Sequence, residues 1–436
     1  MSKTLSKRSA SVAALCAVLA SSVALPFSAF AQNNDGGFLM TLRVAERFIS
    51  RDSDGPDPED NGTTNQAITD VGLSISSETR TQALTFDLDG GYRFVDGPTT
   101  DSFEGEFTDP SVRLTYAQDT ISSSINVIAS ASRRDLDRDS SPLDFAFGVD
   151  GTLDPDFADI TQTIGGTRDR LSFQAALSLR DDAPFGVTFS VNVEDINYNG
   201  LPDASTLSDN TYAEIAADAR FDITPVMQAN IGVHFSQTDI TDSSIRDRYG
   251  IDAGVVLTRP NGEITLNLSA ADGDDGSQSH LTVGRSFILP QSTVNFAAGV
   301  SQASNNDVFL TGTASLEHTF ANDNPLGNIT ATASRDLTRT GRTNEDLVTS
   351  LSLETNYALS PLAFVSLTAD YARSEDILTN DTVDLARANL AVSYDLTENW
   401  TTSAGISVQS RDPSSEASTT SATLSLDVTR SFDLRR

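Results

Sequence analysis

The stretch SATLSLDVTRSFDL, residues 421–434, alternates between apolar and polar side chains. The apolar side chains share one parity, which only Arg430 interrupts: Ala422, Leu424, Leu426, Val428, Phe432 and Leu434. Because successive side chains of a β-strand point to opposite faces, we predict a strand with one apolar and one polar face. A sandwich would bury the apolar face in a protein core, and a membrane barrel would expose it to lipid. The alternation alone does not show whether a protein core or lipid covers the apolar face.

The same alternation recurs along the chain. Between residues 185 and 193, for example, every odd position is apolar. No segment shows a convincing helical stripe with caps. We therefore predict an all-β chain with about twenty strands, at 38–48, 67–77, 83–94, 111–117, 121–132, 170–180, 185–197, 210–221, 226–236, 247–257, 263–271, 280–288, 293–302, 309–320, 327–336, 346–358, 362–373, 384–396, 400–410 and 420–432.

The length of these segments and of their connections favours a membrane. Most segments have about 10–12 residues, roughly twice an average soluble strand and close to the 9–11 that a tilted strand needs to cross a bilayer. Tight connections, such as 222–225 and 359–361, alternate with longer ones rich in Asp, Ser and Asn, such as 237–246 and 374–383. Short turns at one end and long loops at the other are typical of barrels that span a membrane.

Aromatic residues lie at the ends of the expected strands. One set, on the apolar parity, adjoins tight turns or the C-terminus: Phe221, Phe287, Phe320, Tyr357, Tyr394, Trp400 and Phe432. Another set lies at the opposite ends: Tyr212, Phe235, Tyr249 and Tyr371. Aromatic residues favour strands in general, but their placement at strand ends predicts two girdles at the lipid–water interfaces. On this hypothesis the apolar parity faces lipid.

The N-terminus has the pattern of a secretory signal. Lys3, Lys7 and Arg8 precede a short apolar run, and Ala29-Phe30-Ala31 has the form of a cleavage site. We expect residues 1–31 to be removed and residues 32–436 to form the barrel. The one cysteine, Cys16, lies within the signal, so the mature chain has no thiol, disulfide or cysteine metal ligand. No later segment approaches about 18 consecutive apolar residues, which excludes a helical membrane protein.

The alternation, the sorted connections and the aromatic ends resemble those of the outer-membrane β-barrel proteins of Gram-negative bacteria, in a porin-like layout. The resemblance implies a single closed antiparallel up-and-down transmembrane barrel, with 16–18 strands as the alternative count. It implies an outer-membrane location, contact with lipid and lipopolysaccharide, insertion by the barrel-assembly machinery, and compatibility with a homo-oligomer. The end of the chain matches the usual insertion signal in Phe432 and Leu434, and departs from it by continuing to Arg435 and Arg436.

Charge and width point to a passive channel. The net charge is −32, which argues against a nucleic-acid partner because phosphates would be repelled. About twenty strands enclose a lumen too wide for side chains to fill, so small hydrophilic solutes would diffuse through it. Expected lumen-facing acids would favour cations: Asp87, Asp89, Glu194, Glu354, Asp370 and Asp427. The alternatives are an export or assembly barrel for a polysaccharide or envelope component, and a secreted soluble β-rich adhesin.

The longest connection, residues 133–169, has about 37 residues, a length usual for functional or disordered loops. In porin-like proteins such a loop often folds inward and narrows the pore, which would place opposite charges across a constriction: Arg133, Arg134, Asp135, Asp137, Arg138, Asp139 and Asp144. The alternative is an external loop that packs on its neighbours or on lipopolysaccharide.

No other motif indicates chemistry. Acidic runs at 51–62, 135–139 and 272–276 echo calcium loops, but 135–139 is not followed by the required Gly and Glu. We expect no cofactor, and only loose divalent-cation binding on external loops. The three histidines, His234, His280 and His318, have no metal-ligand spacing, and no catalytic fingerprint is present. The sequence therefore predicts a protein that is not an enzyme.

Overall fold

The computed structural model describes residues 37–54, 61–97, 104–136, 166–201, 207–241, 243–274, 276–321, 325–339, 345–414 and 417–435. The expected signal peptide and most of the 133–169 connection lie outside this part of the chain. The described residues contain these strands: β1 (Gly37–Asp54), β2 (Gly62–Glu78), β3 (Gln82–Asp96), β4 (Glu104–Asp119), β5 (Ser123–Asp135), β6 (Thr167–Leu179), β7 (Phe185–Asn199), β8 (Asn210–Thr224), β9 (Met227–Ile240), β10 (Arg246–Arg259), β11 (Gly262–Gly273), β12 (Gln278–Leu289), β13 (Ser292–Gln302), β14 (Val308–Ala321), β15 (Pro325–Arg339), β16 (Glu345–Ser360), β17 (Ala363–Asp376), β18 (Thr382–Thr397), β19 (Trp400–Pro413) and β20 (Thr419–Arg435).

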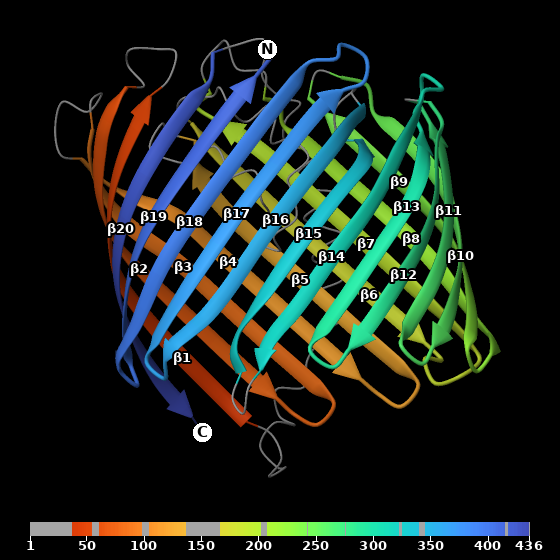
Figure 1. The fold of residues 1–436 in the computed structure, drawn as a ribbon, viewed down its shortest axis with the longest axis horizontal. Coiled ribbons are helices and arrows are strands. Elements are labelled where there is room, and N and C mark those ends of the chain that lie inside the picture. The colour runs from red at the N-terminus through yellow and green to blue at the C-terminus, as the bar shows by residue number, and fades with distance from the viewer. Residues whose placement is uncertain are drawn as a thin grey trace, which may run out of the picture.

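The strands form one closed wall (Figure 1). Each strand pairs antiparallel with the next along the chain, and β20 returns to pair with β1 from Leu39↔Arg435 to Asp54↔Thr420. The prediction of an all-β, single closed antiparallel up-and-down barrel is confirmed. The count is a 20-stranded sheet, so the alternative of 16–18 strands is wrong. Among the described residues, no helix is long and apolar enough to cross a bilayer.

The connections are sorted by length between the two ends of the barrel. Two-residue turns at 225–226, 260–261, 290–291, 361–362 and 398–399 lie at the lower end in Figure 1, where β20 also ends. We call this end the short-turn end and the opposite one the long-loop end. Several strands extend further toward the long-loop end than predicted, because their polar tips carry no apolar alternation.

Strand β4 shows most clearly why a boundary was misplaced. The sequence predicts 111–117, and the strand runs over Glu104–Asp119. The register with the partner strand shifts between Asp89 and Gly91, so Asp109 and Pro110 of β4 form a bulge opposite Gly90, and Asp109 has a positive φ of 47°. A bulge reverses the parity of the residues beyond it, which hides the continuation of the strand from a pattern search.

The pairing registers determine the width of the barrel. A path that follows the paired residues once around the wall returns to β1 roughly 24 residues away from its starting residue. At the usual strand spacing, this offset corresponds to a strand tilt of about 40° and a backbone diameter of about 40 Å. Side chains on opposite walls cannot meet across this distance. The wall alone therefore leaves the barrel axis unfilled.

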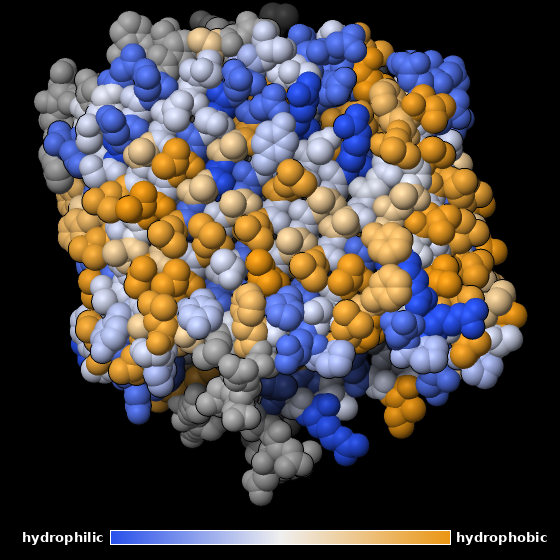
Figure 2. Space-filling model, in the orientation of Figure 1, coloured by the Kyte–Doolittle hydropathy of each residue, from blue (hydrophilic) through white to orange (hydrophobic). Residues whose placement is uncertain are grey.

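The two parities of the strands face opposite sides of this wall. The outer surface carries a broad apolar belt, visible in Figure 2, and its side chains are exposed members of the apolar parity, such as Ile231, Leu268 and Leu426. The polar parity faces the interior. A buried apolar cluster occurs at the long-loop end, where Leu136 packs with Ile196, Tyr198 and Leu207.

Candidate functional site on the inner wall

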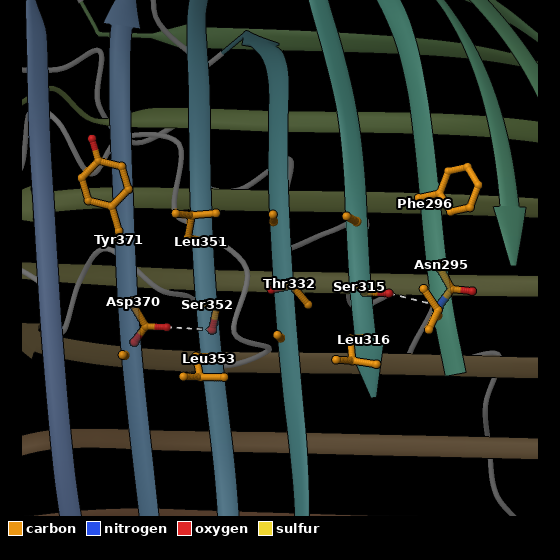
Figure 3. Close-up of a pocket in the computed structure, with 15 residues that line it drawn as sticks. Asn295, Phe296, Ser315, Leu316, Thr332, Leu351, Ser352, Leu353, Asp370 and Tyr371 are labelled. Atoms are coloured by element: carbon orange, nitrogen blue, oxygen red, sulfur yellow. Dashed lines mark hydrogen bonds between the residues drawn. The ribbon is translucent and has the colours of Figure 1, made fainter. Parts of the chain in front are cut away.

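Hydroxyl groups line much of the inner wall and bond to one another between strands. Ser130 and Ser172 lie 2.6 Å apart, as do Ser334 and Ser350, while Asn295 donates to Ser315 over 3.0 Å. Figure 3 shows the Asn295–Ser315 contact and, on β16 and β17, the bond that Ser352 donates to Asp370. These contacts come from adjacent strands at the same level. The result is a hydrophilic lining held in place by the sheet itself.

The six acids expected in the lumen all share the inward parity, but four of them are ion-paired. Asp89 pairs with Arg43 at 3.2 Å, Asp427 with Arg47 at 3.1 Å and Asp370 with Arg387 at 2.8 Å, and Glu194 pairs with Arg170. Asp87 and Glu354 have neutral partners, the hydroxyl of Ser74 at 2.6 Å and the amide of Asn356 at 3.0 Å. An ion pair cancels most of the field of its carboxylate at a distance. Glu354 therefore contributes more negative field than the four ion-paired acids, whereas Arg113 lies directly opposite Asp87 in the register and offsets part of its field.

The arginines that face these acids were not among the residues predicted from the sequence. Arg43 and Arg47 lie four residues apart on β1, hence on one face, and Arg47 also contacts Asp70 at 3.2 Å. Their inward parity was visible in the sequence as Arg43, Arg47 and Arg51 alternating with Leu42, Val44 and Phe48. What was missing is the register, because Arg47 meets Asp427 only when the last strand closes on the first.

The charges are not spread evenly along the barrel axis. Placed by the registers, the inward arginines of β3, β6, β10 and β18 lie in the half nearer the long-loop end: Arg93, Arg168, Arg170, Arg248 and Arg387. Inward acids continue into the half nearer the short-turn end: Asp87, Asp218, Asp252, Glu263, Glu317, Glu354 and Asp395. Arg43, Arg113 and Arg220 also face inward in the short-turn half, but the acids outnumber them, so in the described part of the wall this half has a surplus of negative charge.

The root of the longest connection is divided between the two sides of the wall. Arg133 makes two hydrogen bonds to Asp169, at 2.6 and 2.8 Å, on the outward parity. Asp135 reaches Arg93 at 3.6 Å, and this pair is nearly buried, with exposures of 14% and 5%. Arg134 lies opposite Arg168 on the inward parity. The other residues expected at the constriction lie outside the described part of the chain: Asp137, Arg138, Asp139 and Asp144. The constriction of the pore therefore stays a prediction.

Leu136 shows the direction in which the chain leaves β5. Its amide donates to the carbonyl oxygen of Gly166, and its side chain is buried against Ile196 and Tyr198, which belong to the inward parity of β7. The first residue of the long connection thus packs on the inner side of the wall. A loop that folds into the barrel would have to begin on this inner side of the wall.

The outward aromatic residues gather at two levels. Strand tilt and register together give the height of each residue along the barrel axis. Near the short-turn end, the outward aromatic residues lie within about 8 Å of one another in height: Phe221, Phe287, Phe320, Tyr357, Tyr394, Trp400 and Phe432. Phe48, Phe235, Tyr249 and Tyr371 form a second level about 20 Å higher, close to the height of an outer-membrane apolar band. Tyr212 does not join them: it donates a hydrogen bond to inward-facing Glu214, so its expected place in this set is wrong.

Two arginines on the outward face contact aromatic rings of the level near the short-turn end. The guanidinium of Arg430 lies 5.1 Å from the ring of Trp400 and 4.3 Å from that of Phe432. Arg285 lies 4.7 Å from the ring of Phe287. Both are long side chains that turn toward the edge of the apolar belt, as expected of cations next to lipid. The fold is that of an outer-membrane β-barrel.

Comparison with known proteins adds likeness of fold. No family model matches the chain, and no curated protein matches it. Among solved structures, the chain is similar to Pseudomonas aeruginosa OccK5 (OpdH), with 11% identity over 91% of this chain and 98% of that chain and a TM-score of 0.40. It is also similar to the siderophore receptor PirA from Acinetobacter baumannii, with 10% identity over 92% and 81% of the chains and a TM-score of 0.48. With identities near 10% and TM-scores below 0.5, these similarities carry no conclusion about this chain.

The histidines are held by neighbouring polar groups at separate places. His234 contacts Asp252 at 3.0 Å, and His280 lies 2.7 Å from the fully buried hydroxyl of Ser301. His318 contacts Ser292 at 2.8 Å. Across the described ranges, no group of three or more His, Cys, Asp or Glu side chains is arranged to hold a metal ion. Loose cation binding by external loops remains a prediction.

Proposed function

We propose that this protein is a passive, porin-like channel for small hydrophilic solutes in the outer membrane of a Gram-negative bacterium. The observation that carries the proposal is a closed barrel about 40 Å wide, apolar outside and hydroxyl-lined inside. A soluble β-rich adhesin would bury the apolar parity, whereas Leu268 and Leu426 of this wall are about half exposed, at 52% and 47%. Residues 1–31 are the export signal in this proposal, and lipopolysaccharide and the barrel-insertion machinery are its envelope partners. The proposal includes no catalytic step and no cofactor.

We further propose that the channel favours cations. The surplus of acids in the short-turn half supports this preference, with Asp87 and Glu354 as the acids whose partners are neutral. The preference is moderate, because the arginine pairs neutralise four of the other acids and salt screens the field across so wide a lumen. The acidic external loops would attract the same ions.

Reconstitution into planar bilayers tests both statements. We expect steady conductance, and in a KCl gradient a reversal potential of the sign that cation preference gives. The double variant Asp87→Asn with Glu354→Gln reduces that potential, while Asp195→Asn, on the outward parity of β7, leaves it unchanged. A barrel that inserts but never conducts would favour the alternative of an export or assembly barrel, and a preference for anions would refute the selectivity.

A further inference from the structure

The outer face of β13 to β17 contains a groove in the apolar belt. Three alanines form its floor, Ala314 on β14 and Ala331 and Ala333 on β15. Figure 3 looks onto the groove, with Phe296 of β13 on one side and Leu351 of β16 on the other. The groove encloses about 570 Å³, and the side chains that face outward into it are mainly apolar. We call it the alanine groove and define it by these five residues and Leu316, which lies at its lower end.

The alanine groove lies in the part of the belt that is nearer the long loops. By height it rises from about the middle of the belt, where Leu316 and Ala331 lie, to the level of Tyr371 in the upper aromatic set. Long loops of outer-membrane barrels are external, so in the proposed location the groove faces the outer leaflet. Side chains that border an empty hollow lose their packing contacts, so a hydrocarbon chain in the groove is favoured.

Two arginines lie on the outer face at the top of the alanine groove. Arg335 is the next outward residue after Ala333 on β15, and Arg373 lies on β17. The registers place Thr349 of β16 directly between them, so their Cα atoms are about 10 Å apart. Arg335 donates to the hydroxyl oxygen of Thr349 over 3.5 Å, and the proton of that hydroxyl has no acceptor in the described ranges. Three donor groups therefore border one place above the groove.

The rest of the outer face differs in charge at this level. Elsewhere acids are common there, such as Asp195, Asp247 and Asp272. Arg133 is an outward arginine at the same level, but it makes two hydrogen bonds to Asp169. A negatively charged headgroup would therefore be repelled by much of the wall at this level and attracted to the strands β15 to β17.

The two arginines above the groove keep most of their positive charge. Arg335 has the neutral hydroxyl of Thr349 as its partner. Arg373 reaches Asp384 of β18 at 4.0 Å, on the flank away from Thr349, and this pair is 44% and 30% exposed, which makes it weak. The next outward acid, Glu375, lies two residues further toward the long loops. An anion between the arginines would meet charge that the described chain does not compensate.

We propose that the alanine groove, Arg335, Arg373 and Thr349 bind lipid A, the phosphorylated and acylated anchor of lipopolysaccharide. A phosphate lies between the two guanidinium groups and accepts from the hydroxyl of Thr349, and an acyl chain descends through the alanine groove. Arginine suits this role because its planar fork can donate two hydrogen bonds to one phosphate. The inference rests on the proposed outer-membrane location, in which lipopolysaccharide is the lipid of the outer leaflet.

Charge and shape together select this occupant. Free phosphate would leave the alanine groove empty, and an uncharged lipid would leave the arginines without an anion. A second copy of the chain, related by a two-fold axis along the barrel, would set the arginines of one patch against those of the other at the same height. A lipid with phosphate above and hydrocarbon below matches both parts of the surface.

Titration with lipid A tests the role of the charges. The barrel is purified from outer membranes, washed free of lipopolysaccharide in detergent, and titrated with purified lipid A, with native mass spectrometry to count bound molecules. We expect one tightly bound lipid A, and a loss of affinity of about tenfold or more in the double variant Arg335→Gln with Arg373→Gln. The control Arg285→Gln, an outward arginine on β12 below the groove level, binds like the native chain. Unchanged binding in the double variant would overturn the proposal.

Filling the hollow tests the role of the alanine groove. Ala331→Leu with Ala333→Leu leaves both arginines in place and is expected to weaken lipid A binding about tenfold, because the acyl chain loses its place. Ala253→Leu, at the same height on β10 and outside the groove, is the control. Heat-modifiable migration on gels establishes that each variant forms a barrel. A folded groove variant with native affinity would show that the groove holds no acyl chain.

Two competing ligands identify the source of the phosphate. Phosphatidylglycerol is expected to bind at least about tenfold more weakly than lipid A, and millimolar inorganic phosphate should not displace lipid A. Equal affinity for phosphatidylglycerol, or displacement by inorganic phosphate, would refute the assignment to lipid A. These measurements do not depend on conduction: a barrel that conducts without binding lipid A refutes this inference alone, and one that binds lipid A without conducting refutes the proposed channel alone.

Discussion

The ion pair between Asp370 and Arg387 allows a quantitative test of the inner wall. The side chain of Asp370 is 6% exposed and that of Arg387 is 25% exposed. The carboxylate accepts bonds from Arg387 Nε at 3.2 Å, Arg387 Nη2 at 2.8 Å and the hydroxyl of Ser352 at 2.8 Å. Arg387→Met leaves this carboxylate nearly buried with one neutral donor.

The expected loss follows from the burial of the pair. Breaking a fully buried ion pair by removing one partner costs about 3–5 kcal/mol, and the partial exposure of Arg387 to the lumen reduces this to about 2–3 kcal/mol. Arg43→Met is the matched control, because Arg43 and Asp89 are 51% and 44% exposed and an exposed pair contributes about 1 kcal/mol or less. Replacing both partners, Arg387→Met with Asp370→Leu, should recover most of the loss, since no unpaired charge remains.

Urea unfolding of the barrel in lipid vesicles measures these free energies. The sequence contains one tryptophan, Trp400, which lies at the lower aromatic level and reports folding by its fluorescence. Heat-modifiable migration on gels gives an independent reading. If Arg387→Met and Arg43→Met differ by less than about 1 kcal/mol, or if the double replacement recovers nothing, the buried-pair reasoning is refuted.

Three further predictions concern the ends and the packing of the barrel. Mass spectrometry of the exported protein should show cleavage after Ala31, and a chain that still begins at Met1 would contradict the expected signal. Arg285→Ala should lower the free energy of unfolding by about 0.5–1 kcal/mol, because it removes the contact with Phe287 and the exposed hydrogen bond to Asn261, and an unchanged urea midpoint would show that neither contributes. Gly299→Ala should lower the free energy of unfolding by about 1–3 kcal/mol, because the new Cβ would lie 2.1 Å from the carbonyl oxygen of Leu281. Gly37→Ala is the control and should be neutral, because the space around Gly37 is open. Equal effects of the two substitutions would refute the steric argument.

Alternation was sufficient to predict the strands and which parity is apolar. The face of a strand follows from a period of two, and the apolar parity of β7 or β20 is nearly uninterrupted. Alternation failed to predict the strand where the period itself is broken, as at the bulge formed by Asp109 and Pro110 in β4. It also failed where parity was not applied: Tyr212 and Phe221 lie on opposite parities of β8, so they could not both face outward.

The partners of the charged residues could not be obtained from the pattern. Alternation places Asp427 on the polar face, but a pair with Arg47 depends on a register between segments about 380 residues apart. Register is fixed by the whole circuit of strands and not by either segment.

The pairing of β20 with β1 also constrains when the wall can form. Thr41 donates to Asp433 over 2.8 Å, a contact between residues 392 positions apart, and it belongs to the ladder that closes the barrel. Until the final strand is available, β1 and the last completed strand each present an unpaired edge, and such edges aggregate readily. Nearly the entire polypeptide must therefore be kept unfolded and in solution before closure, which makes its assembly a single late event that depends on chaperones.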